Sequence, residues 1–272
     1  MMRSLWTSAS GMITQQQHVD NITHNLANVN TAGYKKERME FKTLLYETMK
    51  RADLDPANRT GSPVNLQIGH GVRPIAVSRI FTVGNLQRTD NPQDFAIEGD
   101  GFMVVQRSPE SLAYTKDGTL KLSPVDGGLM LATSEGYPVL GEDDDVIIIP
   151  DNVKAADVVV DEEGNFFYFD DQGQQVDLGF RIKLVQFPNA QGLEGMGSNL
   201  LRETVASGAP LSEPDGEVNR PSRLVQGVLE MSNVQVAEEM VNLIVAQRAY
   251  DLNAKGITTS DSMLETANGL KR

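Results

Sequence analysis

The stretch VAEEMVNLIVAQRAYDLNAKGITTSDSML, residues 236–264, carries a large apolar side chain at every seventh position. These positions are Val236, Leu243, Tyr250, Ile257 and Leu264. A seven-residue repeat keeps one stripe of a helix facing a partner helix along its whole length. The stretch therefore predicts a long helix that pairs with another helix.

The N-terminal end of the chain carries a matching pattern. Its first row is Leu5, Met12, Val19 and Leu26, and Ile22 and Val29 form a second row. Two such helices, with the rest of the chain between them, predict a coiled coil that serves assembly rather than catalysis. The residues expected at the assembly interface are Leu5, Met12, Val19, Ile22, Leu26, Val29, Val236, Met240, Leu243, Ile244, Tyr250, Ile257 and Leu264.

The polar residues of the first helix support this interpretation. Between Ser4 and Tyr34 the only formal charge is Asp20, and the other polar positions are mostly amides and hydroxyls. Amides can exchange hydrogen bonds in a crowded helical assembly, where unpaired charges would be costly. The alternative interpretation is a solvated face that happens to be rich in glutamine.

Between the helices the pattern changes twice. Residues 35–66 are charged and then rich in turn residues, which predicts an extended or loop segment after a short helical stretch over 41–49. Residues 67–227 hold short β-branched runs separated by hairpin-type turns such as Asp117-Gly118 and Glu163-Gly164-Asn165. Because no helical-period segment alternates with these runs, we expect an antiparallel β-rich outer domain and an α+β fold.

Four segments follow from these patterns. They are an N-terminal assembly helix at 1–34, an extended or loop segment at 35–66, the β-rich domain at 67–227 and a C-terminal assembly helix at 228–272. The second helix is expected to begin near Ser232, because Ser232 and Gln235 have the spacing of a capping box.

Composition excludes several classes of function. Asp plus Glu number 37 against 24 Lys plus Arg, and a net charge of −13 disfavours binding to nucleic acid or anionic lipid. The absence of cysteine excludes disulfides and thiolate chemistry. We expect neither a metal site nor a cofactor, nor membrane insertion, since no stretch approaches the ~20 apolar residues of a membrane span. Nothing at the N-terminus resembles a cleaved secretory signal.

Candidates for catalysis are limited to acidic clusters beside glycines. They are Asp143-Asp144-Asp145, Asp161-Glu162-Glu163 and Asp170-Asp171. Solvated turns at strand ends have this composition, and the rival interpretation is a loose cation site or a glycosidase pair. No catalytic residue is assigned, and the chain is not expected to be an enzyme.

Several runs resemble signatures of the bacterial flagellar rod and hook protein family. At the N-terminus the run is Leu26-Ala27-Asn28-Val29-Asn30-Thr31-Ala32-Gly33-Tyr34-Lys35. Near the C-terminus the matching parts are Glu230 to Val234, Glu238 to Ile244 and Gln247 to Tyr250. In the β-region they are Ala96 to Phe102 and Tyr114 to Gly118. The run Leu66 to Pro74 and the length are similar to those of the distal-rod members of the family.

The resemblance implies a structural subunit that polymerises into a helical tube, the rod, which crosses the periplasm and transmits torque from motor to hook. It implies export through the flagellum-specific channel without a cleaved signal peptide. The implied partners are further copies of the chain, other rod and hook proteins, and the surrounding outer ring (bushing) proteins. The terminal helices would pair into a coiled coil on the inside, with the β-rich domain outside, and no cofactor is implied.

Three alternatives remain at this point. One is a periplasmic enzyme acting on the cell wall, with the acidic turns as its site. Another is an axial protein of the proximal-rod or hook type. The third is a soluble binding module with two helices, similar to an adhesin.

Overall fold

The computed structural model contains two compact units. The helix–ribbon unit comprises Met1–Ala27, Glu37–Ser78 and Gln235–Arg272, and the β body comprises Asn28–Lys36 and Arg79–Val234. The structure describes residues 2–54, 61–62, 64–108, 111–125, 127–150, 153–154, 157–170, 174–213 and 220–270.

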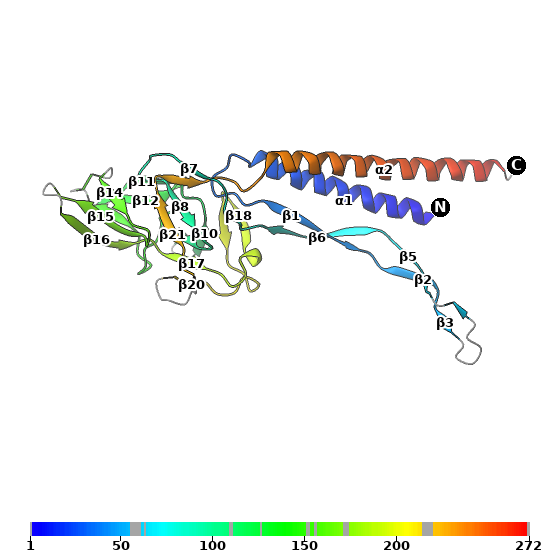
Figure 1. Cartoon of the computed structure of the whole chain (residues 1–272), viewed down its shortest axis with the longest axis horizontal. Helices are drawn as coiled ribbons and strands as arrows, with labels where there is room; N and C mark the ends of the chain where they lie inside the picture. Colours follow the sequence, from blue (N-terminus) through cyan, green and yellow to red (C-terminus); the bar gives the residue numbers. More distant parts are fainter. Residues whose placement is uncertain are drawn as a thin grey trace. The chain divides into compact units, whose positions relative to one another are not determined.

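Figure 1 labels most of the helices and strands along the chain. The helix–ribbon unit holds α1 (Met2–Ala27), β1 (Glu37–Thr43), β2 (Tyr46–Lys50), β3 (Asp53–Leu54), β4 (Gly61–Ser62), β5 (Leu66–Gly69), most of β6 (Val72–Arg79) and α2 (Val236–Gly269). The β body holds β7 (Leu86–Arg88), β8 (Phe95–Glu98), β9 (Phe102–Ser108), β10 (Ser111–Thr115), β11 (Leu120–Val125), β12 (Gly128–Thr133), β13 (Ile148–Pro150), β14 (Val158–Val160), β15 (Asn165–Phe169), β16 (Gln175–Arg181), β17 (Leu184–Gln186), η1 (Ala190–Gly192), β18 (Glu194–Gly197), β19 (Leu200–Arg202), β20 (Leu211–Ser212), β21 (Arg223–Gln226) and β22 (Val228–Glu230).

The β body is built from antiparallel sheets. Its largest sheet has six strands in the order β18-β19-β10-β9-β17-β20, and β11-β12-β13 and β14-β15-β16 form two three-stranded sheets. The strand β8 pairs with β21, and β7 pairs with β22, which joins early and late parts of the chain. The expected α+β fold with an antiparallel β-rich domain is therefore confirmed.

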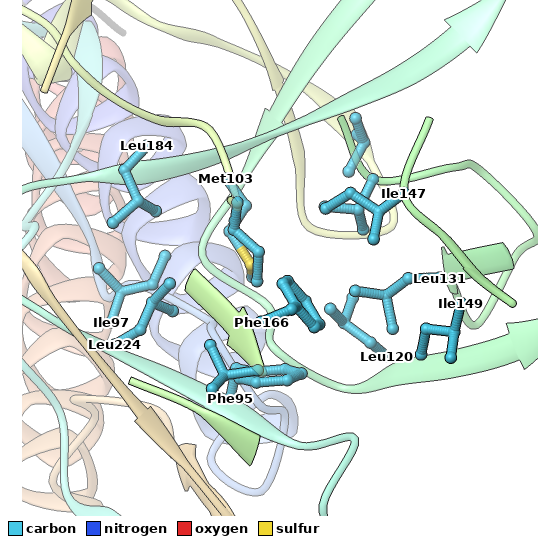
Figure 2. Close-up of a cluster of buried hydrophobic side chains, with 14 of the residues drawn as sticks. Phe95, Ile97, Met103, Leu120, Leu131, Ile147, Ile149, Phe166, Leu184 and Leu224 are labelled. Atoms are coloured by element: carbon cyan, nitrogen blue, oxygen red, sulfur yellow. The ribbon is translucent and has the colours of Figure 1, made fainter. Parts of the chain in front are cut away.

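One apolar cluster fills the space between the sheets of the body. Figure 2 shows Phe95, Met103 and Phe166 pointing toward one another from three different strands. All three side chains are at most 2 % exposed. A second cluster around Phe102 includes Phe187, whose ring meets that of Phe102 edge-to-face at 5.8 Å. The body therefore has a core of its own.

Two of the predicted turns have different outcomes. The turn Glu163-Gly164-Asn165 joins β14 to β15 as a hairpin, with Gly164 at a φ of +90°, as predicted. The prediction of a hairpin at Asp117-Gly118 is wrong, because β10 and β11 belong to different sheets. There Gly118 lies so close to the Phe95 carbonyl that a Cβ atom would overlap it. The glycine is needed for this close approach rather than for a turn between paired strands.

The predicted helical stretch over 41–49 is also wrong. Residues 37–43 form β1 and residues 46–50 form β2, which pair with β6 and β5 respectively. A second strand after the loop satisfies the backbone hydrogen bonds, so the local apolar spacing does not decide the structure. Residues 55–60 and 63, in the predicted loop segment 35–66, lie outside the described residues.

The second helix begins at Val236 rather than near Ser232, so the predicted capping box does not form. The Ser232 hydroxyl instead accepts a hydrogen bond from the Val234 N–H at 3.3 Å. Next to it, the Asn233 side chain donates to the Ile80 carbonyl and accepts from the Lys36 N–H. These contacts hold the chain extended until it leaves the body. No described helix is long and apolar enough to cross a membrane.

A buried ion pair joins the segments through which the chain enters and leaves the β body. The Lys35 ammonium lies 2.5 Å from Oε1 of Glu230 and also donates to the Thr82 carbonyl. The same carboxylate oxygen accepts from the Gly84 N–H at 2.7 Å, while Oε2 has no hydrogen-bond partner among the described residues. Both side chains are at most 5 % exposed. Three distant segments of chain are therefore held at one point.

A second buried lysine lies near this pair and gives the body a pH-dependent stability. Lys116 donates to the Gly99 carbonyl at 2.7 Å, and burial together with the charge of Lys35 lowers its pKa to about 8. The nearby carboxylates of Glu230, Asp100 and Glu213 act in the opposite direction. The folded protein therefore binds its proton less tightly than the unfolded chain does.

We expect the β body to gain about 2–3 kcal/mol of stability as the pH rises from about 8 to about 10, because the unfolded chain retains the Lys116 proton over that range. Below about pH 8 both states are protonated and the full penalty is present. The measurement is urea unfolding across this pH range. In Lys116→Met the gain should disappear, whereas the exposed control Lys121→Met should keep it. A parent profile that is flat or falling over this range would contradict the prediction.

Candidate assembly surface

The two helices lie side by side and antiparallel within one chain, and both termini are at the same end of the pair (Figure 1). The Ser4 and Ser260 hydroxyl oxygens are 3.0 Å apart, and Asn25 donates to Glu239 at 3.3 Å. Gly11 faces Asn253 so closely that a Cβ atom would come within 2.9 Å of its amide. Small and polar side chains therefore make much of the contact between the helices.

The predicted apolar residues do not fill this contact. Ile22 is buried at 2 % exposure, but Leu5, Met12, Val19, Leu26 and Val29 are only half-buried. In α2 the residues Leu243, Ile257 and Leu264 are half-buried, whereas Val236, Met240, Ile244 and Tyr250 are between 40 and 52 % exposed. Most of the predicted interface is thus available to another molecule, and its role in assembly stays a prediction.

Two further apolar rows were missed. One row lies on α1 and consists of Met2, Trp6 and Ile13, which are at least 60 % exposed. The other row lies on α2 and consists of Val241, Val245, Leu252 and Met263, with exposures of 56 to 68 %. Spacings of four, seven and eleven residues place each row on one face of its helix. The sequence alone shows the same spacing, but the longer seven-residue rows are the stronger pattern, and the prediction is based on them.

The two-stranded ribbon adds apolar surface to the same unit. Every residue of β2 is exposed, and it pairs with β5 from Tyr46 opposite Gly69 onward. Leu45 is 87 % exposed and Val64 70 % exposed. Strands with this much apolar surface in the open are a liability unless another chain covers them.

Apolar residues are distributed oppositely in the two units. In the described part of the helix–ribbon unit, Ile22 and Ala246 are the only buried apolar residues, whereas the β body holds all the others. Conversely, most of the large exposed apolar side chains of the described chain belong to the helix–ribbon unit. A unit with almost no core of its own must bury its surface elsewhere to be stable.

Polar contacts anchor α1 to the ribbon beside it. Thr14 is 2 % exposed, and its hydroxyl donates to the Ser10 carbonyl within the helix and lies 3.5 Å from the Val72 carbonyl. The His18 ring meets Phe41 edge-on at 5.3 Å. Burial lowers the pKa of His18, and the nearby Glu239 charge acts against that shift. The helix thus uses one flank for the ribbon, another for α2, and leaves the remainder open.

Two of the three acidic clusters, Asp143-Asp144-Asp145 and Asp161-Glu162-Glu163, lie in turns between strands. Partial burial acts to raise the pKa of Asp161, but hydrogen bonds from Asn165, Glu163 and Gly164 hold it below its usual value. Lys183 pairs with Asp144 at 2.5 Å. Asp171 lies outside the described residues. Among the described residues, no group of three or more His, Asp or Glu side chains has the arrangement of a metal site.

Comparison with known protein families gives three matches along the chain. A model described as flagella basal body rod protein matches residues 5–35. One described as flagellar hook protein FlgE/F/G D1 domain matches residues 96–168. One described as flagellar basal body rod FlgEFG protein C-terminal matches residues 225–270.

Three relatives are similar over their full length. The flagellar basal-body rod protein FlgG of Borreliella burgdorferi is 45 % identical over 100 % of both chains. FlgG of Buchnera aphidicola subsp. Acyrthosiphon pisum is 42 % identical, over 99 % of this chain and 100 % of its own. FlgG of Bacillus subtilis is 36 % identical over 100 % of both.

Proposed function

Because this chain belongs to the flagellar basal-body rod protein family, we propose that it is a structural subunit of the distal rod that polymerises into a helical tube and transmits torque from motor to hook. The observation that carries the proposal is the helix–ribbon unit, which exposes its apolar side chains while burying almost none. A repeated contact between unlike faces that does not close into a ring generates an open helical filament. Further copies of the chain would bury these faces.

The helix pair extends this proposal to the inner part of the tube. The predicted interface residues, together with the rows around Trp6 and Leu252, would contact helices of neighbouring copies and form coiled-coil-like packing there. The β body, which has its own core, would lie outside this layer. Its role is to carry contacts to other rod and hook proteins and to the surrounding outer ring, in the part of the rod that crosses the periplasm.

Export before assembly fits the same distribution of apolar residues. A helix pair with two buried apolar side chains gains little stability by itself, so it would unfold easily for passage through the flagellum-specific channel. After export, contacts with neighbouring subunits would cover the helix pair and order it. Export through this channel would not depend on a cleaved signal peptide.

The direct test of the proposed function is polymerisation. The purified chain should form rods visible by electron microscopy, and a chain that lacks residues 2–27 and 236–270 should not. The shortened chain should keep the melting transition of the β body, because its core residues lie outside the deleted segments. Rod formation by the shortened chain would overturn the proposal.

Hydrogen exchange on dilute monomer checks the ordering step. Amides of the helical residues 2–27 and 236–269 should exchange much faster than those of 102–105, which lie in the buried strand β9. In assembled rods the terminal amides should become protected. Strong protection of both ends in a verified monomer would show that the helices are stable before assembly.

A further inference from the structure

The contact between α1 and α2 repeats with a period of seven residues. Toward the N-terminus of α1, Asn25 is followed after two such steps by Gly11 and after a third by Ser4. In the opposite direction along α2, Glu239 is followed at the same steps by Asn253 and Ser260. These six residues meet pairwise and are called the polar seam here.

Asn25 is the most heavily used member of the polar seam. Its side chain is 1 % exposed, and its amide pairs with both backbone groups of Glu37, donating at 2.8 Å and accepting at 2.9 Å. Its amide nitrogen also donates to Oε2 of Glu239. One side chain therefore joins α1, β1 and α2.

Glu239 needs this contact. Its carboxylate is 1 % exposed and accepts hydrogen bonds from Asn25 and, at 3.4 Å, from Asn242. A buried carboxylate that loses a hydrogen-bond donor is strongly unfavourable. Positions along α1 other than Asn25 would have to supply that donor if the helices slid past one another.

In the half of the polar seam near the chain ends, around Gly11 and Asn253, the fit of side chains distinguishes the observed register from a shifted one. The Asn253 side chain bonds back to the Ala249 carbonyl, and its amide lies where Gly11 has no side chain. Gly256 likewise lies opposite the Ser8 hydroxyl, which a Cβ atom would approach within 2.9 Å. A glycine within a helix costs roughly 1 kcal/mol against alanine, so close approach is the physical reason for both glycines.

We propose that the polar seam sets the register of the two helices. A slip by seven residues would move Asn25 away from Glu239 and bring Asn253 opposite Ser4 or His18, where a Cβ atom occupies the space that Gly11 leaves free. A buried polar residue in a helix–helix contact specifies register at some cost in stability. An apolar seam of leucines would tolerate such a slip.

Register matters for assembly because it fixes the offset between the exposed row of α1 around Trp6 and that of α2 around Leu252. This consequence rests on the proposed function. A slipped pair would present its rows to the next copy with the wrong offset, although each helix would still be intact. The polar seam therefore determines the specificity of the assembly surface without being exposed itself.

The chain has no cysteine, so engineered cysteine pairs can report the register directly. Ser4→Cys/Ser260→Cys reports the observed register, because the two hydroxyl oxygens are 3.0 Å apart. Ser4→Cys/Ala267→Cys and Ser8→Cys/Ala249→Cys report slips of seven residues in the two directions. Disulfide content at equilibrium in glutathione buffer measures how often each register is populated.

The test variant is Gly11→Ala/Asn253→Ala/Glu239→Leu. Each change removes a register-specific contact while favouring helix or apolar packing, so helix content by circular dichroism should not fall. The native reporter should lose disulfide roughly tenfold, and a slipped reporter should gain it. The matched control Glu265→Leu/Gly269→Ala, on exposed positions of α2, should leave all three reporters unchanged.

The reporters are read in monomer and in assembled rods of the full-length chain. An unchanged native disulfide with silent slipped reporters in the test variant would overturn the register role, whether or not rods form. So would the absence of the native disulfide from the parent chain in both states. A slipped pair that still builds normal rods would refute the link to assembly. A parent chain with the native register that never forms rods would refute the proposed function alone.

Discussion

A subunit carrying Leu243→Asp should be excluded from rods while its β body melts at the parent temperature. Leu243 lies half-buried on α2, in the row that we propose to meet neighbouring helices. In the monomer the new carboxylate can still reach water, but assembly would bury it without a partner, at a cost of several kcal/mol per subunit. Leu26→Asp on α1 should behave in the same way. Pelleting of rods and calorimetry of the monomer are the two measurements.

The matched control for this experiment is Leu112→Asp. Leu112 is a leucine of β10 with 44 % exposure, so it receives the same substitution on a surface of the β body outside the helix–ribbon unit. It should assemble at close to the parent level. If Leu243→Asp assembles as well as Leu112→Asp, the helical row does not contact neighbours. If Leu243→Asp lowers the melting temperature of the body, its effect is on folding instead.

The seven-residue pattern predicts the existence of both helices but not which face joins them. Leucine and valine rows look like the contact because apolar side chains usually fill it. Within one chain, however, Gly11 and Ala246 allow close approach, and Asn25 and Glu239 satisfy each other. An apolar row meant for another molecule is indistinguishable in sequence from one meant for the partner helix. Only the contacts in the structure show which row faces the partner helix and which row is left exposed.

In the middle of the chain, turn chemistry predicts β structure but not the partners of the strands. Pairing of β8 with β21 joins residues more than a hundred positions apart, and no local signal encodes it. The mistaken helix over 41–49 has the same origin, since β6 and β5 lie further along the chain. The role of Lys35 was also missed, because its carboxylate partner Glu230 is distant in sequence. Lys35 and Glu230 both belong to runs that resemble signatures of the family. That resemblance identifies the family, but it does not show that the two side chains form an ion pair.

Breaking the Lys35–Glu230 ion pair should cause the largest single loss of stability in the β body. In Lys35→Met the Glu230 carboxylate stays buried without its cation, which should lower the free energy of unfolding by about 3–5 kcal/mol. In Lys35→Met/Glu230→Gln the charge is gone and the amide oxygen can still accept from Gly84, so most of that loss should be recovered. Urea unfolding of the parent, both single variants and the double variant gives the coupling energy.

An exposed ion pair of the same length provides the control. Arg88 and Asp90 are also 2.5 Å apart, but their side chains are 82 % and 72 % exposed. Water and salt screen such a pair, so Arg88→Met should cost well under about 1 kcal/mol. Burial, rather than distance, then explains the difference between the two pairs. If Lys35→Met costs no more than Arg88→Met, or if the double variant is no more stable than Lys35→Met, the buried pair does not hold the three segments together.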